Sequence, residues 1–213
     1  MQLPSSLTSK LAAGYPWAAS PLIVSAPMAK VAMPKLAVAV SKAGGLGFIA
    51  AGYHKGHGDT TLESINGVPK FLPVGVGFIT WSASLEKALP SFSRYCPAAV
   101  WLFAPPKGFQ DLIPWVTKIR EATSSRSKIW VQVGSVSDAV GVVNAIDPDV
   151  IVVQGLDAGG HSLARGASII SLVPEINDKI RQLRPYPQKQ ADFLAAGGIS
   201  DSRGVAAAMA LGA

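Results

Sequence analysis

A histidine directly behind two glycines is the first candidate for chemistry in this sequence. His161 follows Gly159 and Gly160 in residues 150–166, VIVVQGLDAGGHSLARG, where four β-branched apolar residues predict a buried strand leading into a loop. Glycines put no side chain between such a histidine and a flat ligand, so His161 can act there as a general acid or base. The competing interpretation is a loop histidine whose ring is bonded to a backbone carbonyl.

A second pair of glycines closes another apolar run. Gly197 and Gly198 stand in residues 195–213, AAGGISDSRGVAAAMALGA, just before a Ser-Asp pair that predicts the start of a helix. Backbone N–H groups near a helix N-terminus can bind a phosphate, although two glycines can also do no more than make a tight turn. The segment lacks G-x-x-x-x-G-K-[ST], so a P-loop nucleotide hydrolase is not supported. Nearby Asp157, Asp201 and Arg203 are interpreted as loop and helix-cap residues.

The other potential metal or redox ligands do not form a recognisable site. His54 and His57 are three residues apart in GYHKGHGD, but the glycines favour a loop and no third ligand is evident, so we expect no metal there. Cys96 is the one cysteine of the chain, which excludes a disulfide framework within it. We expect Cys96 to be a small buried residue in a protein of a reducing compartment.

Composition favours one globular domain over residues 1–213. The chain is 49% hydrophobic and 15% charged, which is enough apolar material for a sizeable core. Its net charge of +6 comes from scattered residues without a basic stretch interleaved with aromatics, so we expect no nucleic-acid partner. A net positive charge is compatible with a small anionic ligand, and equally with an ordinary solvated surface that binds nothing. Neither a signal peptide nor an apolar run of roughly 20 residues is found, so we expect a soluble, cytoplasmic protein without a membrane partner.

Short continuous apolar runs alternate with helix-like segments along the chain. Continuous runs are typical of parallel strands covered on both faces. Seven strands are predicted, at residues 21–28, 46–51, 71–78, 98–104, 128–134, 149–155 and 192–198. Six helices are predicted between and after them, at residues 33–45, 82–95, 109–124, 135–146, 167–183 and 200–213. The link after the second strand is uncertain, because TLESING is short for a helix.

This alternation predicts a parallel α/β domain, for which two architectures compete. A (β/α)₈ TIM barrel and a doubly wound open sheet share the same order of elements. Glycines and polar residues follow several different strands here, as in APM, GVGF, QVGS, QGLDAGGH and AAGGIS. A barrel carries its chemistry on loops after many strands, whereas an open sheet concentrates it at one switch point, so the barrel is favoured.

The motifs in their order resemble one known family. APM after the first run is followed by SKAGGLGFIAAGY, GVGF, VQVGS, VVQGLDAGGH, LVPEI and AAGGISDSRGVAAAMALGA. This series, which runs from about residue 21 to residue 213, is similar to the nitronate monooxygenases, formerly called 2-nitropropane dioxygenases. The resemblance implies a TIM-barrel flavoprotein with non-covalent FMN that oxidises alkyl nitronates with molecular oxygen.

The resemblance also implies roles for residues around the flavin ring. Met28 would lie against the ring through its backbone. Gln132 and Gln154, on the fifth and sixth strands, would point polar groups at the flavin. Gly159 and Gly160 would leave room for the ring.

The remaining implied roles concern the phosphate and the substrate. Gly197 and Gly198 would bind the FMN phosphate. His161 would be the catalytic histidine, which takes a proton from a neutral nitroalkane or holds an anionic nitronate.

The sequence departs from the family pattern in three places. It has Ala29, Lys30 and Val31 where many members have glycine, and Gly77 where bacterial members often have asparagine. The third departure is that the last predicted helix ends where an eighth strand should start. We therefore expect a barrel without its eighth strand, an incomplete C-terminus, and reduced flavin affinity and activity.

Two other functions remain open at this point. The first is an NAD(P)H-dependent flavin reductase of enoyl thioesters or quinones. The second is a truncated flavin-binding or interaction protein without turnover. The sequence does not distinguish oligomeric states.

Overall fold

The computed structural model describes residues 14–51, 72–160, 166–185 and 191–213. These residues form two compact units. The first holds the chain up to Pro106 together with Asp111–Ile129, and the second holds Lys107–Gln110 together with Trp130–Ala213. In each unit, parallel strands alternate with helices along the chain.

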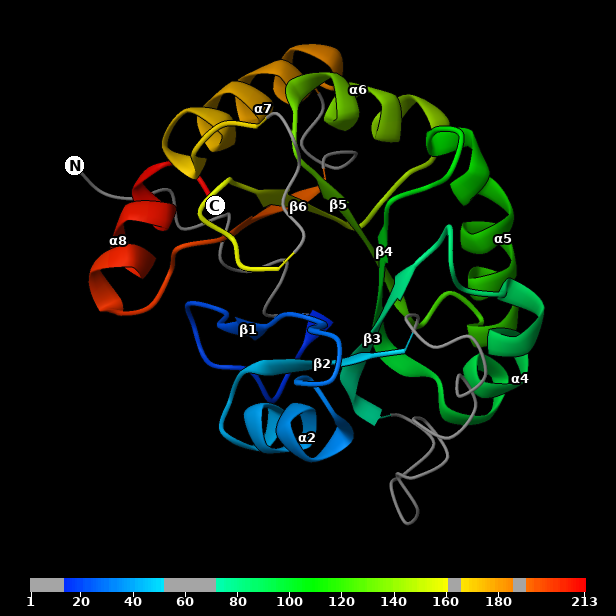
Figure 1. Cartoon of the computed structure of the whole chain (residues 1–213). Coiled ribbons are helices and arrows are strands. Elements are labelled where there is room, and N and C mark those ends of the chain that lie inside the picture. Colours follow the sequence, from blue (N-terminus) through cyan, green and yellow to red (C-terminus); the bar gives the residue numbers. More distant parts are fainter. Residues whose placement is uncertain (1–13, 52–71, 161–165, 186–190) are drawn as a thin grey trace. The chain divides into compact units, whose positions relative to one another are not determined.

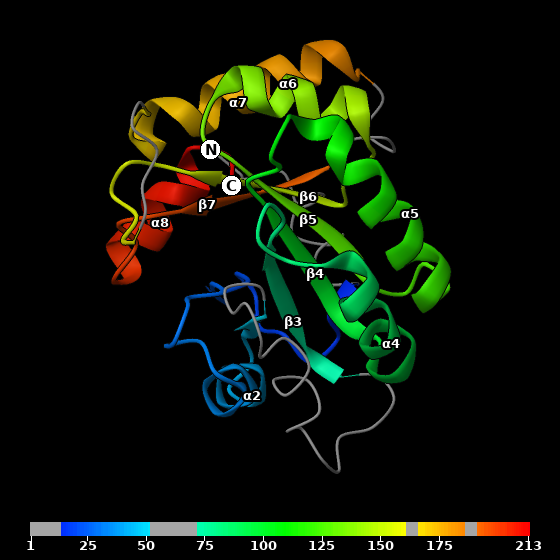
Figure 2. The same ribbon diagram turned by 45° about the vertical axis from the view of Figure 1, so that its right-hand side comes forward.

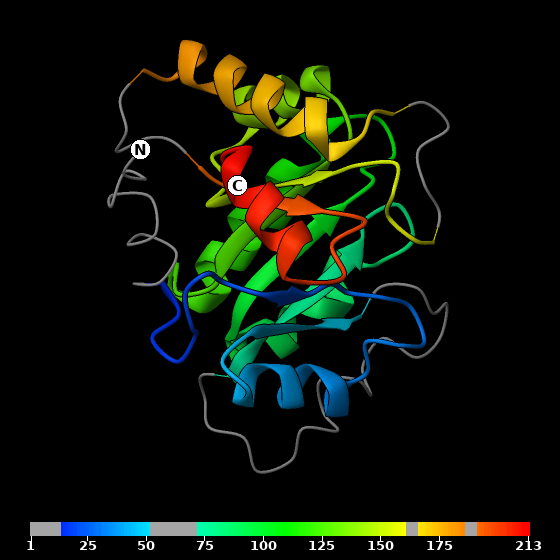
Figure 3. The same ribbon diagram turned by 90° about the vertical axis from the view of Figure 1, so that its left-hand side faces the viewer.

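The first unit contains four parallel strands, each paired with the next one in the sequence. These strands are β1 (Val24–Ser25), β2 (Leu46–Ala50), β3 (Leu72–Ile79) and β4 (Pro97–Phe103). Three helices accompany them: α2 (Pro34–Lys42), α4 (Leu85–Tyr95) and α5 (Leu112–Thr123), the last preceded by the short 3₁₀ helix η1 (Phe109–Asp111). Figure 2 shows α4 and α5 side by side next to β4, and Figure 3 shows α2 running alongside β2.

Aromatic side chains join the strands and helices of the first unit. Phe48 of β2 meets Trp101 of β4 edge-on, with ring centroids 5.2 Å apart. Phe78 of β3 contacts both Phe92 of α4, at 5.6 Å, and Trp115 of α5, at 5.3 Å. All five side chains are at least nine-tenths buried. Phe78, Phe92 and Trp115 form the core between the sheet and helices α4 and α5. Trp101 is in register with Gly77 and therefore packs with Phe48 on the opposite face of the sheet.

The second unit repeats the pattern with three parallel strands in sequence order. They are β5 (Lys128–Val133), whose part from Trp130 onward belongs to this unit, β6 (Val150–Gln154) and β7 (Asp192–Ala196). Its helices are α6 (Val136–Ala145), α7 (Ile169–Leu183) and α8 (Ser202–Ala210). Figure 1 shows α6 and α7 lying side by side along β5 and β6. Arg184, just after α7, donates to the Asp147 carboxylate and the Val143 carbonyl, which fastens the ends of α6 and α7 together.

The predicted elements are confirmed within the described residues. Each of the seven predicted strands and six predicted helices is present, and no further strand occurs in the described ranges. TLESING lies outside them. Cys96 is 1% exposed, which confirms that it is a small buried residue. Among the helices of the described ranges, none combines the length and apolar character needed to cross a membrane.

The largest difference from prediction is the first strand. The run at 21–28 predicts a full strand, but only Val24 and Ser25 pair with β2. Pro21 and Pro27 flank this pair, and a proline has no N–H to donate to a ladder. Apart from the Ile23 carbonyl, which accepts from the Leu46 N–H at 3.0 Å, the rest of the run is not in register with β2.

Helix α2 contacts β2 so closely that the strand needs a glycine at the contact. A Cβ on Gly47 would lie 2.1 Å from the backbone oxygen of Ala37, and the Gly47 N–H donates to Ser41 Oγ at 3.1 Å. A side chain at position 47 would therefore push the helix off the strand.

We predict that Gly47→Ala lowers the free energy of unfolding by about 1–3 kcal/mol or more, because an added methyl in a packed contact forces the backbone to move. Urea unfolding of the purified chain measures this change. Gly14→Ala is the matched control, since the one described atom within 4 Å of a Cβ there is Lys128 Cε, at 3.9 Å. Equal stability of the two variants would contradict the helix–strand contact.

Candidate functional site

The candidate site of the second unit is the edge where β6 and β7 end. The Gly155 N–H donates to the Ala196 carbonyl at 2.9 Å, which keeps these strands paired to their ends. The loop after β6 is closed at its base, because Leu156 N–H donates to the Ala167 carbonyl at 3.0 Å. Both predicted glycine pairs belong to the two loops that leave this edge.

Gly197 and Gly198 bring the loop after β7 against the loop after β6. Their φ angles are +107° and +71°, in the region that favours glycine. A Cβ on Gly197 would lie 2.8 Å from Ala158 N, and one on Gly198 would lie 2.9 Å from Asp157 Cβ. Loop packing therefore requires both glycines, whatever ligand they bind.

Gly159 and Gly160 differ from the other pair. A Cβ on either residue would meet no described atom within 4 Å. Gly160 has a φ of +84°, which gives it a conformational reason to be glycine, but Gly159 has neither a positive φ nor a close neighbour. Among the described residues, therefore, none packs against this pair of glycines.

The start of α8 satisfies its own hydrogen-bonding groups. Asp201 caps the helix, since its Oδ1 accepts from the N–H groups of Arg203, at 3.0 Å, and Gly204, at 3.2 Å. Its Oδ2 accepts from Arg203 Nε at 2.9 Å. The expectation that Asp201 and Arg203 serve the cap is confirmed. The helix N–H groups that Asp201 occupies are not available to a phosphate.

The turn before α8 offers other donors. Within the described part of the chain, the backbone N–H groups of residues 197–200 make no hydrogen bond. The predicted phosphate site therefore fits the turn itself and not the first turn of α8.

Hydrogen bonding also changes the titration of Asp201. The bond from Arg203, followed by the bond from the Gly204 N–H, lowers the pKa of the Asp201 carboxyl below its ordinary value. A lowered carboxyl pKa stabilises the folded state above the ordinary pKa, and this contribution is lost as the pH falls through the folded pKa.

Gln132 and Gln154 meet at the carboxyl ends of two neighbouring strands. Gln132 Nε2 donates to Gln154 Oε1 at 2.6 Å, and both side chains are half-buried at the ends of β5 and β6. Two amides of adjacent strands thus form one polar pair at the carboxyl edge of the sheet.

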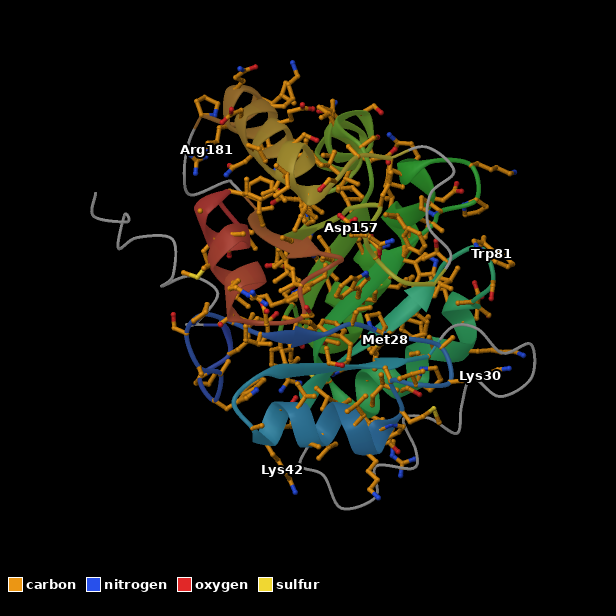
Figure 4. All side chains as sticks on the ribbon, turned by 60° about the vertical axis from the view of Figure 1, so that its left-hand side comes forward. Met28, Lys30, Lys42, Trp81, Asp157 and Arg181 are labelled. Carbon is orange, nitrogen blue, oxygen red and sulfur yellow. The ribbon has the colours of Figure 1, made fainter. Side chains whose placement is uncertain are left out.

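Met28, the remaining predicted flavin contact, belongs to the first unit and is 41% exposed. Its carbonyl accepts from Val31 N–H, at 3.1 Å, and Ala32 N–H, at 2.8 Å, while its own N–H makes no hydrogen bond among the described residues. Figure 4 shows Met28, Lys30 and Trp81 on the same side of this unit, with Lys42 at the far end of α2.

Two predictions about histidines fall on residues whose structure is not described. His161 lies in 161–165, and His54 and His57 lie in 52–71, all outside the described ranges. Within the described ranges, no group of three His, Cys, Asp or Glu residues could hold a metal ion.

Sequence reasoning missed Ser168 as a support of this edge. Its Oγ accepts from the Ile170 N–H at the start of α7 and donates to Asp157 Oδ2 at 3.4 Å. A serine just before an apolar helical run is typical of an N-cap, and a helix that follows β6 must begin near the carboxyl edge. That reasoning would have found the residue.

Comparison with known proteins identifies the family. The family model described as "Nitronate monooxygenase" matches residues 16–129 and 113–213. The chain belongs to the nitronate monooxygenase family. It is 43% identical to nitronate monooxygenase npaC of Metarhizium robertsii and 36% identical to a nitronate monooxygenase of Neurospora crassa. These matches cover 95% and 96% of this chain but 58% and 60% of the two relatives, so the chain spans about three-fifths of their length.

Solved structures show the fold class of this family member. FabK from Thermotoga maritima has a TM-score of 0.71 at 27% identity, covering 95% of this chain and 58% of its own. A nitroalkane oxidase from Streptomyces ansochromogenes also scores 0.71, at 24% identity, with 95% and 65% covered. The predicted TIM-barrel fold class and the predicted family are both confirmed.

The two glycine pairs should respond differently to alanine. We predict that Gly197→Ala lowers the free energy of unfolding by at least about 2 kcal/mol, because both the positive φ and the contact with Ala158 N resist a side chain. Gly159→Ala should stay within about 0.5 kcal/mol of the wild type. Urea unfolding of both variants measures the contrast, and a Gly159→Ala loss as large as that of Gly197→Ala would contradict the open loop.

We predict that Asp201→Ala lowers the melting temperature by about 2–4 °C, the size expected for losing a helix cap in a chain of this length. Asp201→Asn keeps an acceptor for the helix but loses the charge that pairs with Arg203. The difference in melting temperature between wild type and Asp201→Asn should be largest above a pH of about 4 and should shrink below it, because the carboxylate is then protonated. Thermal unfolding at several pH values measures this difference, and a gap that widens on acidification would refute the ion pair.

Proposed function

We propose that the protein catalyses the FMN-dependent oxidation of alkyl nitronates with molecular oxygen. Membership of the nitronate monooxygenase family carries this proposal. The open surface at Gly159 supports it, because neither backbone conformation nor packing in the described residues explains a glycine there. A flat ring against that surface would explain it.

The described residues fit a flavin nucleotide. Residues 197–200 present four backbone N–H groups in one turn, which suits the phosphate of FMN. The amides of Gln132 and Gln154 supply polar groups at the neighbouring strand ends. Gly159 and Gly160 would lie against the ring.

The flavin, when bound, supplies the electron transfer from the nitronate and the reaction with oxygen. The protein's own part is to hold the cofactor, orient the substrate and move a proton. His161 would take the α-proton of a neutral nitroalkane at one of its ring nitrogens, and in its protonated form would hold the anionic nitronate.

An absorbance spectrum of the purified chain, followed by anaerobic addition of a nitronate, tests the proposal. We expect flavin absorbance that bleaches with the nitronate and returns with oxygen. Consumption of NADH without nitronate-dependent oxygen uptake would favour a flavin reductase of enoyl thioesters or quinones. A colourless protein that takes up no added FMN would contradict the proposed cofactor.

We predict that His161→Ala slows turnover of a neutral nitroalkane by about 10²- to 10⁴-fold, the usual contribution of a general acid–base group. A preformed nitronate should be affected less, since no proton has to be removed from it. Bound FMN should be retained, because the ring and phosphate contacts lie on other residues. Oxygen uptake with both substrate forms measures the effect, and unchanged turnover of the neutral nitroalkane would rule out the role.

A further inference from the structure

The amides of Gln132 and Gln154 share one face of the second unit's sheet. Gln132 is in register with Val152 of β6, and Gln154 follows Val152 by two residues, so all three point to the same side. The next residue, Gly155, points toward α7, since a Cβ on it would lie 2.8 Å from Ile169. Alternation therefore directs Gln154 to the face opposite α7.

The hydrogen bond between the two amides has a direction. A glutamine amide has an accepting oxygen and a donating NH₂ group. Gln132 Nε2 donates and Gln154 Oε1 accepts, at 2.6 Å. The accepting end of Gln154 is thereby occupied, and its Nε2 makes no hydrogen bond within the described ranges.

The surroundings of Gln154 determine what its NH₂ group can bind. Val152, two residues before Gln154 on the same face, is fully buried. The residue of β7 that is in register with Gln154 is the small Ala196. Gln154 is therefore the polar end of an apolar strip, with a small neighbour beside it. A half-buried NH₂ group in such a place requires an acceptor from a ligand or from water.

We infer that Gln132 is a positioning residue that holds the Gln154 amide with its NH₂ group toward the ligand, so that position 154 selects a hydrogen-bond acceptor. The inference rests on the proposed function for the ligand, a flavin, whose ring carbonyl oxygens are such acceptors. The role of Gln132 is to set which end of the neighbouring amide the flavin meets.

The variant Gln132→Glu tests this role without altering Gln154. At neutral pH the introduced carboxylate can only accept, so the Gln154 amide must turn to donate to it and present its oxygen to the ligand. The dissociation constant for FMN, measured by fluorescence quenching on the apoprotein, should then rise about 10- to 100-fold over that of the wild type.

Acidification should reverse this effect. Near a pH of about 4, the introduced carboxyl becomes protonated and can donate to Gln154 Oε1, which restores the original direction. The ratio of the variant's FMN affinity to the wild-type affinity at the same pH should therefore return toward one. Gln132→Met is the matched control, because it cannot titrate and its ratio should not change with pH.

A second variant approaches the pair from the other side. In Gln154→Glu the bond from Gln132 is kept, but an oxygen replaces the NH₂ group toward the ligand. Its FMN affinity should fall at neutral pH and recover at low pH, with circular dichroism showing that both variants remain folded.

Three outcomes of these binding measurements decide whether Gln132 orients the Gln154 amide. Weak binding by Gln132→Glu at pH 7 with recovery near pH 4 supports the inference. Wild-type-like binding at pH 7, or weak binding without recovery, overturns the inference and leaves the proposed function standing, since the wild type binds FMN. A wild type that binds no FMN overturns the flavin proposal and the ligand side of this inference together. The hydrogen bond between the two side chains is then tested on the apoprotein by thermal unfolding. At pH 7 the melting temperature of Q132E/Q154E should fall by more than the two single-variant decreases added together, and near pH 4 this excess should disappear.

Discussion

The candidate site depends on how closely two loops approach each other at the ends of β6 and β7. The position of a Cβ on Gly197 lies 2.8 Å from Ala158 N, a distance at which only glycine fits. This contact, together with the strand-end bond from Gly155 N–H to the Ala196 carbonyl, fixes the backbone from which the loop after β6 departs. Because the approach is between backbone groups, side-chain adjustment cannot relieve it, and the placement of the open glycines that follow rests on it.

Charge at this edge is largely balanced inside the protein. Asp201 takes the first N–H groups of α8 and pairs with Arg203, so the helix end carries its own anion. A ligand phosphate would therefore gain little from the helix dipole and would depend on the N–H groups of the preceding turn. The amide pair follows the same logic, since the oxygen of Gln154 is satisfied within the fold and its NH₂ group remains to define what can bind.

The sequence predicts the elements of this chain well and the site only in part. β6 could be recognised because VIVVQ is continuously apolar until its last residue, and α7 because IISLVPEINDKIRQL is apolar at helical spacing. The two glycine pairs look alike in sequence. Packing between loops requires Gly197 and Gly198, whereas a Cβ on Gly159 or Gly160 would meet no described atom within 4 Å, and this difference depends on which loops touch. The direction of the amide bond likewise depends on the register of β5 against β6, which no local pattern contains.

The departures from the family pattern in the first unit show how local changes are compensated structurally. Lys30 adopts a φ of +63°, in the region that favours glycine, within a turn where Val31 and Ala32 both donate to the Met28 carbonyl. Near the end of β3, a Cβ on Gly77 would lie 2.3 Å from Pro27 Cβ, so the proline ring leaves room for nothing larger than glycine there. Pro27 belongs to the same loop as Lys30. A side chain at position 77 would require this turn after β1 to move, so the close approach of loop and strand is what Gly77 makes possible.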